Sequence, residues 1–407
     1  MAALGSMVLA GPVRAQSAAA EPGSRLTVYL MTMGTGRRVW ERFGHNAIWI
    51  HDPVYGTDQT YNYGLFDFRQ DNFLLRFIRG RMWYWMAGYP AHRYVEQYRR
   101  DNRSVWVQEL NLPPRARLEL QEFLQWNERP DNRFYHYDYY RDNCSTRVRD
   151  AIDRVLEGRI KAQTEGRMVA ASYRFHTQRL TANDPLIFTG LLLALGKPVD
   201  RPLSAWEEMF LPLELRVRLR EVTVPGPGGT TEPLVISERT LFESSAPAPP
   251  DAPPSWLGAY LAMGLTIGLG ARVLGRKGAM SDSARIGFTV LVGSWAVVVF
   301  AAGTVLAFLW WGTDHVMASA NENLFQLNPL AGVLGLSLLG LKRGSPGRTR
   351  FGAGVATVLA TLSLAGLVAQ LLPGMDQVNG PIIALALPAH LGTALGLRAF
   401  AQGPRTR

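Results

Sequence analysis

The sequence predicts an α+β domain followed by an all-α bundle of about five membrane-spanning helices. The first half of the 407-residue chain is polar, with frequent Arg and aromatic residues. Its strand-like segments alternate with helix-like ones, a pattern typical of a soluble α+β domain. The second half consists mainly of long apolar stretches, and a Pro-rich segment separates the two halves. We therefore expect a soluble unit and a membrane unit.

Composition shifts divide the chain into five segments. The N-terminal residues are apolar and end in a small-x-small pattern at Val13-Arg14-Ala15, which is typical of a signal peptide. The segment SSAPAPPDAPPS favours an extended polyproline conformation of roughly 3 Å per residue, which suits a linker. We assign a signal peptide to 1–15, the soluble domain to 25–243, the linker to 244–255, the transmembrane domain to 256–398 and a basic cytoplasmic tail to 399–407.

Five apolar stretches come close to the roughly 20 residues that a spanning helix needs. Lys and Arg gather in the loops after the first and third stretches and in the C-terminal tail, whereas the other two loops have none. Because positively charged loops stay in the cytoplasm, we expect the soluble domain outside the cytoplasm and the C-terminus inside. The stretches are Trp256–Leu274, Ile286–Trp311, Leu324–Leu341, Phe351–Leu372 and Pro381–Leu397.

The chain has a formal net charge of +10, which suits an anionic lipid surface as well as nucleic acid. The apolar stretches favour the membrane as partner, and an exported domain rarely meets nucleic acid, so we expect no nucleic-acid partner. The seven histidines are scattered, and no group of metal-ligand residue types has convincing spacing. We therefore expect no metal site.

Cys144 is the only cysteine, so an internal disulfide is excluded. Apolar residues recur after it at helical spacing, which predicts a helix whose first turn contains Cys144 and whose N-cap is Asn143. The amides of a helix N-terminus and a nearby imidazole stabilise a thiolate, so we predict that Cys144 is a nucleophile.

A strand-borne histidine supplies the expected base. Strand-like patterns cover Leu26–Met33, Gly44–Ile50 and Thr60–Gly64. His45 begins the second of these strands, and Asn62 or Tyr63 on the third could orient the other nitrogen of its ring. His51 shares the parity of His45 but lies near the end of the strand, so it is a weaker candidate.

A purely structural interpretation of the same residues stays open. Cys144 could be a small buried hydrophobe and His45 a hydrogen-bonded core residue. The helix-start position, the polar neighbours and the export of a lone thiol favour catalysis. Arg147, one turn into the helix, could hold a phosphate or pair with Asp142 or Asp150.

Three motifs carry a family resemblance: FGHNAIWIHD, YNYGLFDF and RFYHYDYYRDNCSTRVRD. Together they resemble the Lnb N-terminal periplasmic domain family of bacterial lipoprotein N-acyltransferases, over roughly Arg25 to Phe242. DRPLSAWEEMFLP, at Asp200–Pro212, is similar to a later segment of that family. More distantly, the chain resembles NlpC-type peptidases and the lecithin:retinol acyltransferase group, in which a His precedes the Cys.

The resemblance implies a permuted papain-like (NlpC-type) fold, with Cys144 as acyl acceptor and His45 as base. It implies a bacterial inner membrane protein with a periplasmic N-terminal domain, and no cofactor. The Cys144 thiolate would attack an acyl ester of a phospholipid, and the N-terminal amine of a diacylated lipoprotein would take the acyl chain from the thioester. Oxyanion donors would be the Cys144 amide and a side chain such as Asn143 or Tyr63.

Two further segments have competing interpretations. Phe73–Tyr89 mixes arginines with aromatic residues and suits a membrane interface, although a core helix and strand are favoured. The loop Thr313–Gln326 contains His315, Asn321 and Asn323. A loop outside the cytoplasm is expected to lack Lys and Arg, and this alone can explain its composition. Alternatively, these side chains could contact the lipoprotein or a lipid headgroup.

Two other function classes remain beside the acyltransferase. An exported papain-like cysteine hydrolase, acting on cell-wall peptides or lipid amides and esters, would use the same residues and let water resolve the thioester. The other is a non-catalytic membrane scaffold. Several spans favour the transferase, because a cell-wall peptidase needs only a tether.

Overall fold

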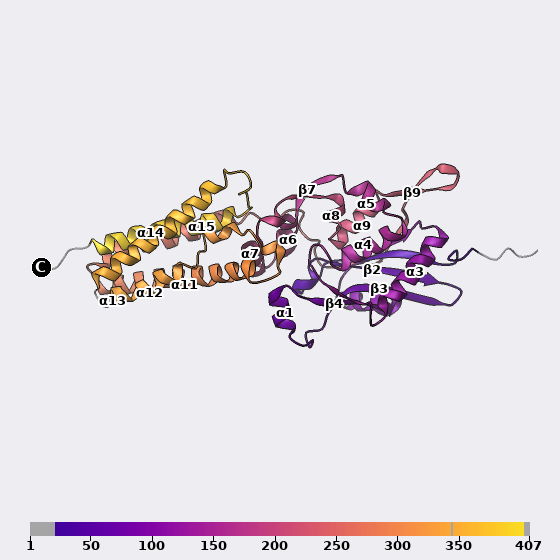
Figure 1. Cartoon of the computed structure of the whole chain (residues 1–407), viewed down its shortest axis with the longest axis horizontal. Coiled ribbons are helices and arrows are strands. Elements are labelled where there is room, and N and C mark those ends of the chain that lie inside the picture. Colours follow the sequence, from indigo (N-terminus) through magenta and orange to yellow (C-terminus); the bar gives the residue numbers. More distant parts are fainter. Residues whose placement is uncertain (1–20, 343–344, 403–407) are drawn as a thin grey trace, which may run out of the picture.

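The computed structural model describes residues 21–342 and 345–402. Figure 1 shows a mixed α/β domain at one end of the molecule and a helical bundle at the other. The predicted signal peptide at 1–15 and the last five residues of the predicted basic tail lie outside the described residues. Ser244–Ser255, the predicted linker, contains no helix or strand.

The α/β domain is built on a seven-stranded sheet in which every neighbouring pair is antiparallel. Its order is β11–β5–β1–β2–β3–β4–β6. The three strands predicted from alternation are present as β1, β2 and β3. The strands are β1 (Thr27–Met33), β2 (His45–Asp52), β3 (Thr57–Leu65), β4 (Trp83–Pro90), β5 (Val105–Leu110), β6 (Phe134–His136) and β11 (Val235–Phe242).

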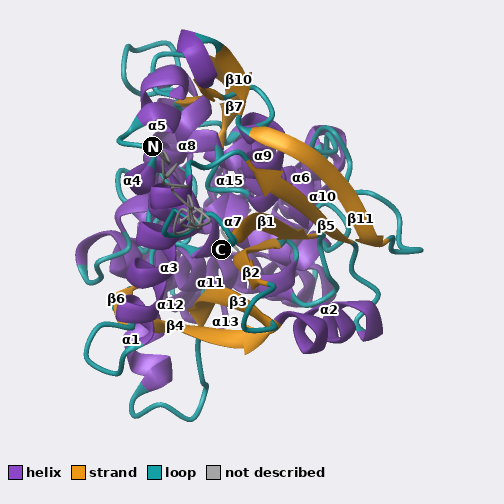
Figure 2. Ribbon diagram, turned by 90° about the vertical axis from the view of Figure 1, so that its right-hand side faces the viewer, coloured by secondary structure: helices purple, strands orange, loops and turns teal. Residues whose placement is uncertain are grey.

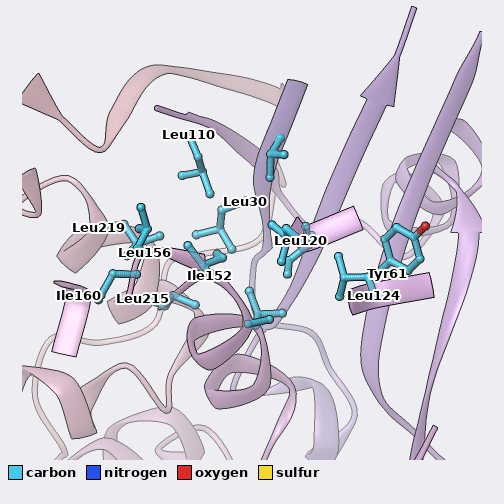
Figure 3. Close-up of a cluster of buried hydrophobic side chains, with 14 of the residues drawn as sticks. Leu30, Tyr61, Leu110, Leu120, Leu124, Ile152, Leu156, Ile160, Leu215 and Leu219 are labelled. Carbon is cyan, nitrogen blue, oxygen red and sulfur yellow. The ribbon is translucent and has the colours of Figure 1, made fainter. Parts of the chain in front are cut away.

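Helices cover both faces of this sheet, as Figure 2 shows. On one face lie α3 (Pro114–Glu128), α4 (Cys144–Val155) and α9 (Pro212–Leu219), and their leucines and isoleucines form the main core with Leu30 of β1 (Figure 3). The other face is covered by α2 (Ala91–Arg100). Because side chains alternate along a strand, His45 and Ala47 of β2 face α2, while Asn46 and Ile48 face α4.

The remaining elements of the domain are short. Two small antiparallel pairs join β7 to β8 and β9 to β10. The elements are α1 (Phe73–Arg79), α5 (Arg159–Thr164), β7 (Met168–Ser172), α6 (Tyr173–Thr181), α7 (Pro185–Ala194), β8 (Pro202–Ser204), α8 (Ala205–Glu208), β9 (Thr223–Pro225) and β10 (Thr231–Pro233), with 3-10 helices η1 (Val39–Glu41), η2 (Lys197–Val199) and η3 (Pro227–Gly229).

The described residues include four helices long and apolar enough to cross a membrane. α10 and α15 pack so closely that a Cβ on Gly392 would lie 2.0 Å from the carbonyl oxygen of Gly268, a contact that only small residues permit. The four helices are α10 (Leu257–Gly278), α11 (Asp282–Trp311), α14 (Pro346–Ala369) and α15 (Gly380–Ala401).

The prediction of about five spanning helices is therefore wrong at Leu324–Leu341. This segment is broken into short helices because Asn328 and Pro329 interrupt it, and Pro lacks the backbone N–H that a helix needs. Its helices are η5 (Glu322–Phe325), α12 (Ala331–Ser337) and α13 (Leu339–Lys342); η4 (Val316–Ala318) precedes them. The segment packs against α11 and α14, and Gln326 donates to the carbonyl oxygen of Ser363 in α14 (3.1 Å). Irregular backbone at membrane depth is tolerated where protein covers it in this way.

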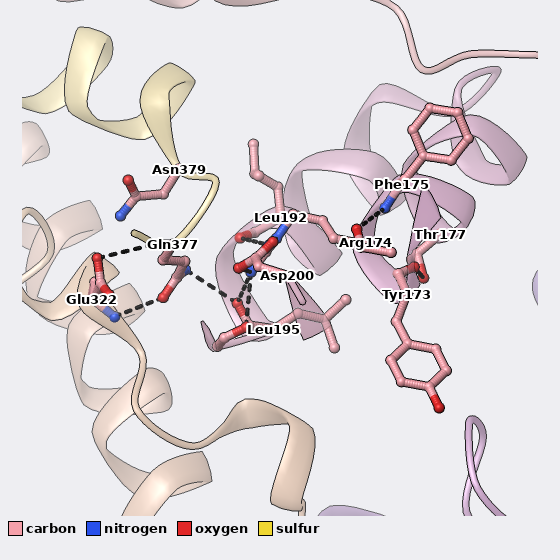
Figure 4. A network of polar contacts seen from close by, with 12 residues as sticks. Tyr173, Arg174, Phe175, Thr177, Leu192, Leu195, Asp200, Glu322, Gln377 and Asn379 are labelled. Atoms are coloured by element: carbon pink, nitrogen blue, oxygen red, sulfur yellow. Dashed lines mark hydrogen bonds and ion pairs between the residues drawn. The ribbon is translucent and has the colours of Figure 1, made fainter. Parts of the chain in front are cut away.

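A polar network joins the α/β domain to the ends of the bundle helices that face it (Figure 4). Buried Arg174 of α6 pairs with Asp200 at 2.5 Å and donates to the carbonyl oxygen of Leu195 at 2.8 Å. Gln377, in the loop between α14 and α15, donates to the same carbonyl at 3.3 Å and accepts from the backbone N–H of Glu322 at 2.8 Å. The two parts therefore share buried hydrogen bonds.

Candidate active site

Cys144 is the first residue of α4, as predicted, and Asn143 is its N-cap. The Asn143 side-chain oxygen accepts from the backbone N–H groups of Ser145 (2.8 Å) and Thr146 (3.0 Å), which a helix start would otherwise leave unpaired. Backbone N–H groups of Asn46, Ser145 and Cys144 itself bond to the Cys144 sulfur and lower its pKa. Cys144 as a whole residue is half-buried.

The end of the β2–β3 ladder makes room for the thiol. The ladder stops at the pair Ala47–Asn62, so the amide of Asn46 has no partner on β3. Gly64, just beyond, has φ +87°, and a Cβ there would lie 3.2 Å from the Cβ of Cys144. A larger residue would be strained and would press on the nucleophile, so this glycine supports the close approach of α4 to the sheet.

His45 lies at the same end of the sheet, beside two tyrosines of α2. Its ring is 6.4 Å from the ring of Tyr94 and 6.5 Å from that of Tyr98, measured between centroids. Nε2 of His45 is buried and has no hydrogen-bond partner among the described residues. Asn62 lies next to the imidazole and raises its pKa, and the Asn62 side-chain oxygen is also buried and without a partner. These two atoms are complementary, because an imidazole N–H can donate to an amide oxygen.

Arg103 is a third member of the site that sequence reasoning missed. It is buried, donates from Nε to the carbonyl oxygen of Gly34 (3.0 Å) and lies over the ring of Tyr98 at 4.6 Å. Within the part of the chain that the structure describes, one of its terminal nitrogens has no hydrogen-bond partner. Its positive charge lowers the pKa of both His45 and Cys144, so one guanidinium is close to both groups. No local pattern marks it, because its place depends on the turn that follows α2.

Burial determines the protonation states of Cys144 and His45 in the resting protein. It raises the pKa of Cys144 to about 11, against the smaller lowering by the backbone amides and Arg103. Burial and then Arg103 lower the pKa of His45 to about 3. At neutral pH the resting site therefore holds a neutral thiol and a neutral imidazole, in place of the thiolate expected from the helix start. Such a site ionises its nucleophile only when the base takes the proton during attack.

We predict that iodoacetamide alkylates Cys144 slowly at neutral pH. With a pKa of about 11, roughly 0.01% of the thiol is ionised at pH 7, against a few per cent of an ordinary thiol. The alkylation rate should be on the order of 100-fold below that of the SDS-unfolded chain and should rise about tenfold per pH unit up to pH ~10. Mass spectrometry of the single cysteine measures it. A rate that is constant from pH 6 to 9 would instead indicate a thiolate–imidazolium pair.

The structure gives Asn143, Tyr63 and Arg147 partners of their own. Asn143 donates to the carbonyl oxygens of Tyr139 and Phe210, so both its amide protons are used. The buried Tyr63 hydroxyl donates to Asn127 at 2.7 Å. Neither side chain is free as an oxyanion donor. Arg147 forms a two-pronged pair with Asp142 and lies over the ring of Tyr135, so the ion-pair interpretation of this arginine holds in the structure.

The three polar residues of the loop Thr313–Gln326 form hydrogen bonds where the α/β domain meets the bundle. His315 donates from Nε2 to the carbonyl oxygen of Phe77 (3.0 Å) and accepts from the Tyr139 hydroxyl (3.3 Å). Asn321 donates to the carbonyl of Leu193, and Asn323 to those of Leu192 and Leu193, at the C-terminal end of α7. These bonds satisfy helix-end carbonyls, so the structure gives Asn321 and Asn323 a capping role.

One group of possible metal ligands occurs in the described part of the chain: His176, Glu208 and Glu214. Arg179 donates to Nδ1 of His176 (3.0 Å) and to Glu214 (3.1 Å), and Arg218 donates to Glu208 (2.6 Å). Nε2 of His176 lies 3.1 Å from Glu208. Two arginines therefore supply positive charge where a metal ion would, and the group is a buried ion-pair network.

Comparison with known proteins supports the resemblance of the motifs. Residues 16–182 match the family model of the Lnb N-terminal periplasmic domain, which includes β1 to α4 and both members of the Cys144–His45 pair. No curated protein matches the chain, and no solved structure matches it. Residues 16–182 of the chain are therefore similar to the Lnb N-terminal periplasmic domain, and a helical region with four candidate membrane spans lies further along the chain.

Proposed function

We propose that the protein is a membrane-bound lipoprotein N-acyltransferase that works through a thioester on Cys144. The observation that carries this proposal is the thiol at the start of α4, where backbone amides of Asn46 and Ser145 lower its pKa, with His45 at the same end of the sheet. The family domain and the four apolar helices support a reaction between membrane lipids. A strand-borne His preceding a helix-start Cys also fits the permuted papain-like arrangement, which stays a prediction.

In the first step, His45 takes the proton of the thiol as the sulfur attacks the ester carbonyl of a phospholipid. The carbon–oxygen bond then breaks, and the lysophospholipid oxygen leaves with the proton from His45. If Nε2–H of His45 donates to the Asn62 oxygen, Nδ1 is the nitrogen left to act as base. Asn62 is thus proposed as a positioning residue, and the amides of Cys144 and Asn46 as oxyanion donors.

In the second step, the N-terminal amine of a diacylated lipoprotein attacks the thioester carbonyl. An amide bond forms, the carbon–sulfur bond breaks, and a proton of the amine returns to the sulfur through His45. One nucleophile thus serves two lipid substrates in turn, which predicts ping-pong kinetics. Both substrates lie in the membrane that the helices cross.

Arg103 is expected to stabilise negative charge in both steps. We predict that Arg103→Met lowers the rate of acyl transfer by about 10- to 100-fold, because one charged hydrogen-bond donor is lost near the reacting atoms. Arg103→Lys should recover part of the loss, since the charge returns without the geometry of the guanidinium. Initial rates of lysophospholipid release measure the effect. If the Arg103→Met protein transferred acyl groups at the wild-type rate, Arg103 would have no role in the reaction.

Mass spectrometry tests the proposed function. The purified full chain is incubated with a phospholipid whose acyl chains are deuterated and with a diacylated lipopeptide. We expect a lipopeptide that carries a deuterated N-acyl group, with one lysophospholipid per transfer. The alternative is a hydrolase, which would release deuterated free fatty acid and leave the amine unmodified. If neither product forms, the scaffold class is favoured.

A further inference from the structure

Helix α1 presents apolar side chains to its surroundings. Of its seven residues none is buried, and no acidic residue occurs in its first turn. Leu74 is 69% exposed, and Leu75, Phe77 and Ile78 are also exposed. The prediction of a core helix at Phe73–Tyr89 is thus wrong for this half of the segment, whereas its other half is strand β4 of the sheet. A surface helix with apolar residues in consecutive positions is unusual unless something covers it.

The exposed apolar surface continues beyond the helix. Phe73 packs against Phe68 at 5.1 Å between ring centroids, and Phe68 against Trp40 at 5.8 Å. Phe68 and Trp40 are themselves more than half exposed. Arg79 and Arg81 adjoin this surface, and Arg81 is exposed. We call the following set the α1 patch: Val39, Trp40, Phe68, Leu74, Leu75, Phe77 and Ile78.

The C-terminal end of α1 is fixed to the end of a spanning helix. Asp314, three residues after the last residue of α11, donates from its backbone N–H to the carbonyl oxygen of Arg79 (2.9 Å), and its carboxylate pairs with Arg81 (2.6 Å). His315 donates to the carbonyl of Phe77 at 3.0 Å. Figure 1 accordingly shows α1 on the edge of the domain nearest the bundle.

The length of α11 places that point at the surface of the membrane. A helix of 30 residues extends about 45 Å, against roughly 30 Å for the hydrocarbon core of a bilayer, so its ends reach the headgroup layers. Trp310 and Trp311 end it as a stacked pair, and tryptophan is enriched at this depth. The α1 patch, tied to the residues that follow, therefore lies level with lipid headgroups and the first part of the acyl chains.

Aromatic side chains connect the patch with the thiol. Phe73 of α1 stacks on Phe66 at 6.1 Å, and Phe66 stacks on Tyr84 of the sheet at 5.0 Å. Phe66 follows Gly64 by two residues, and Gly64 adjoins Cys144. An acyl chain that leaves the bilayer beside α1 would thus meet apolar surface on its way to the nucleophile.

We propose that α1 inserts into the outer lipid leaflet and that the α1 patch is the place where a phospholipid acyl chain passes from the bilayer to Cys144. The insertion of α1 is inferred from the exposed apolar side chains of the α1 patch and from the hydrogen bonds that join α1 to the residues after α11. It does not depend on any reaction. The passage of the acyl chain rests on the proposed function. Arginines beside the patch suit the phosphate of the lipid.

A depth measurement on the full chain tests the insertion. Because Cys144 is the only cysteine, the Cys144→Ala protein accepts a single new one at Leu75, labelled with an environment-sensitive fluorophore and reconstituted into phosphatidylcholine–phosphatidylglycerol vesicles. The matched control is Val54→Cys, another exposed apolar residue, in the turn at the far end of β2 from His45. For the label at residue 75 we expect a blue-shifted emission and strong quenching by lipids that carry bromine near the headgroup. For the label at residue 54 we expect neither.

Equal emission and equal quenching at positions 75 and 54 would overturn the insertion. Energy transfer between labelled copies, without lipid quenching, would show that a second copy of the chain covers the patch and would also overturn the insertion.

Acyl-transfer assays then test whether the acyl chain passes over the α1 patch to Cys144. Leu74→Asp with Leu75→Asp should slow acylation from vesicle phospholipid at least fivefold and leave acylation from a soluble dihexanoyl phospholipid unchanged. Equal slowing with both donors would overturn the passage. If the wild-type chain transfers no acyl group, the proposed function fails, and the quenching result still decides the insertion.

Discussion

Replacing Cys144 by alanine is expected to abolish acyl transfer, with a loss of at least 10³-fold in rate. The reason is that no other thiol exists in the chain, so no covalent intermediate can form. In the wild-type protein, mass spectrometry after incubation with phospholipid should show one added acyl group that hydroxylamine removes. The Cys144→Ala protein should show none.

The fold should survive this substitution, so that the loss can be assigned to chemistry. The hydrogen bonds that lower the pKa of Cys144 come from backbone amides, which the substitution leaves in place, and alanine fits the same space with the same helix start. We expect the free energy of unfolding to change by about 1 kcal/mol or less. Cys144→Ser is the closer control of shape, and it should also lose most activity, because a hydroxyl is a weaker nucleophile. A folded Cys144→Ala protein that still complements a deletion of the gene would establish the scaffold class, and one with full transfer activity would rule out the thioester.

Local sequence signals were enough to predict the elements that carry the pair. Asn143 is a strong N-cap and is followed by apolar residues at helical spacing, so the start of α4 at Cys144 could be predicted to the residue. The alternation of apolar and polar residues likewise predicted strand β2, which begins at His45 as expected. Both signals depend on neighbours in the chain, and the structure bears them out.

The features that could not be predicted depend on contacts between distant residues. The position of Arg103 is set by the carbonyl of Gly34 and the ring of Tyr98, which only the folded sheet and α2 bring together. The partners of Asn321 lie on α7, more than 120 residues earlier. The sign of the Cys144 pKa shift is also tertiary, because burial outweighs the local effect of the helix start.

The broken third span has a different cause. A hydropathy window averages over about 20 residues and therefore conceals a local interruption such as Asn328-Pro329. The apolar composition of Leu324–Leu341 indicated correctly that the segment belongs to the bundle, since it packs on α11 and α14. Composition could not show that Gln326 and Ser363 stabilise an unwound stretch between them.

The second large effect is expected from His45→Ala, which should lower the rate of acyl transfer by about 10²- to 10⁴-fold. With a pKa of about 11, Cys144 needs a base at neutral pH, and we propose His45, whose pKa Arg103 lowers together with that of Cys144, as this base. His51→Ala is the matched control, because His51 lies on the same strand and pairs with Asp58 at 2.8 Å, at the opposite end of β2. It should retain nearly full activity.

The pH profile separates a catalytic His45 from a merely structural one. A base whose pKa is lowered to about 3 is unprotonated throughout the neutral range, so the wild-type rate should stay nearly constant from pH ~5 to ~9. Without the base, the thiol must ionise by itself. Since its thiolate fraction rises with pH until the pKa of about 11, the His45→Ala rate should climb about tenfold per pH unit from pH 7 to 10. Initial rates of lysophospholipid release at each pH measure both profiles. A His45→Ala protein whose loss is the same at every pH would mean that the imidazole only supports the fold around Cys144.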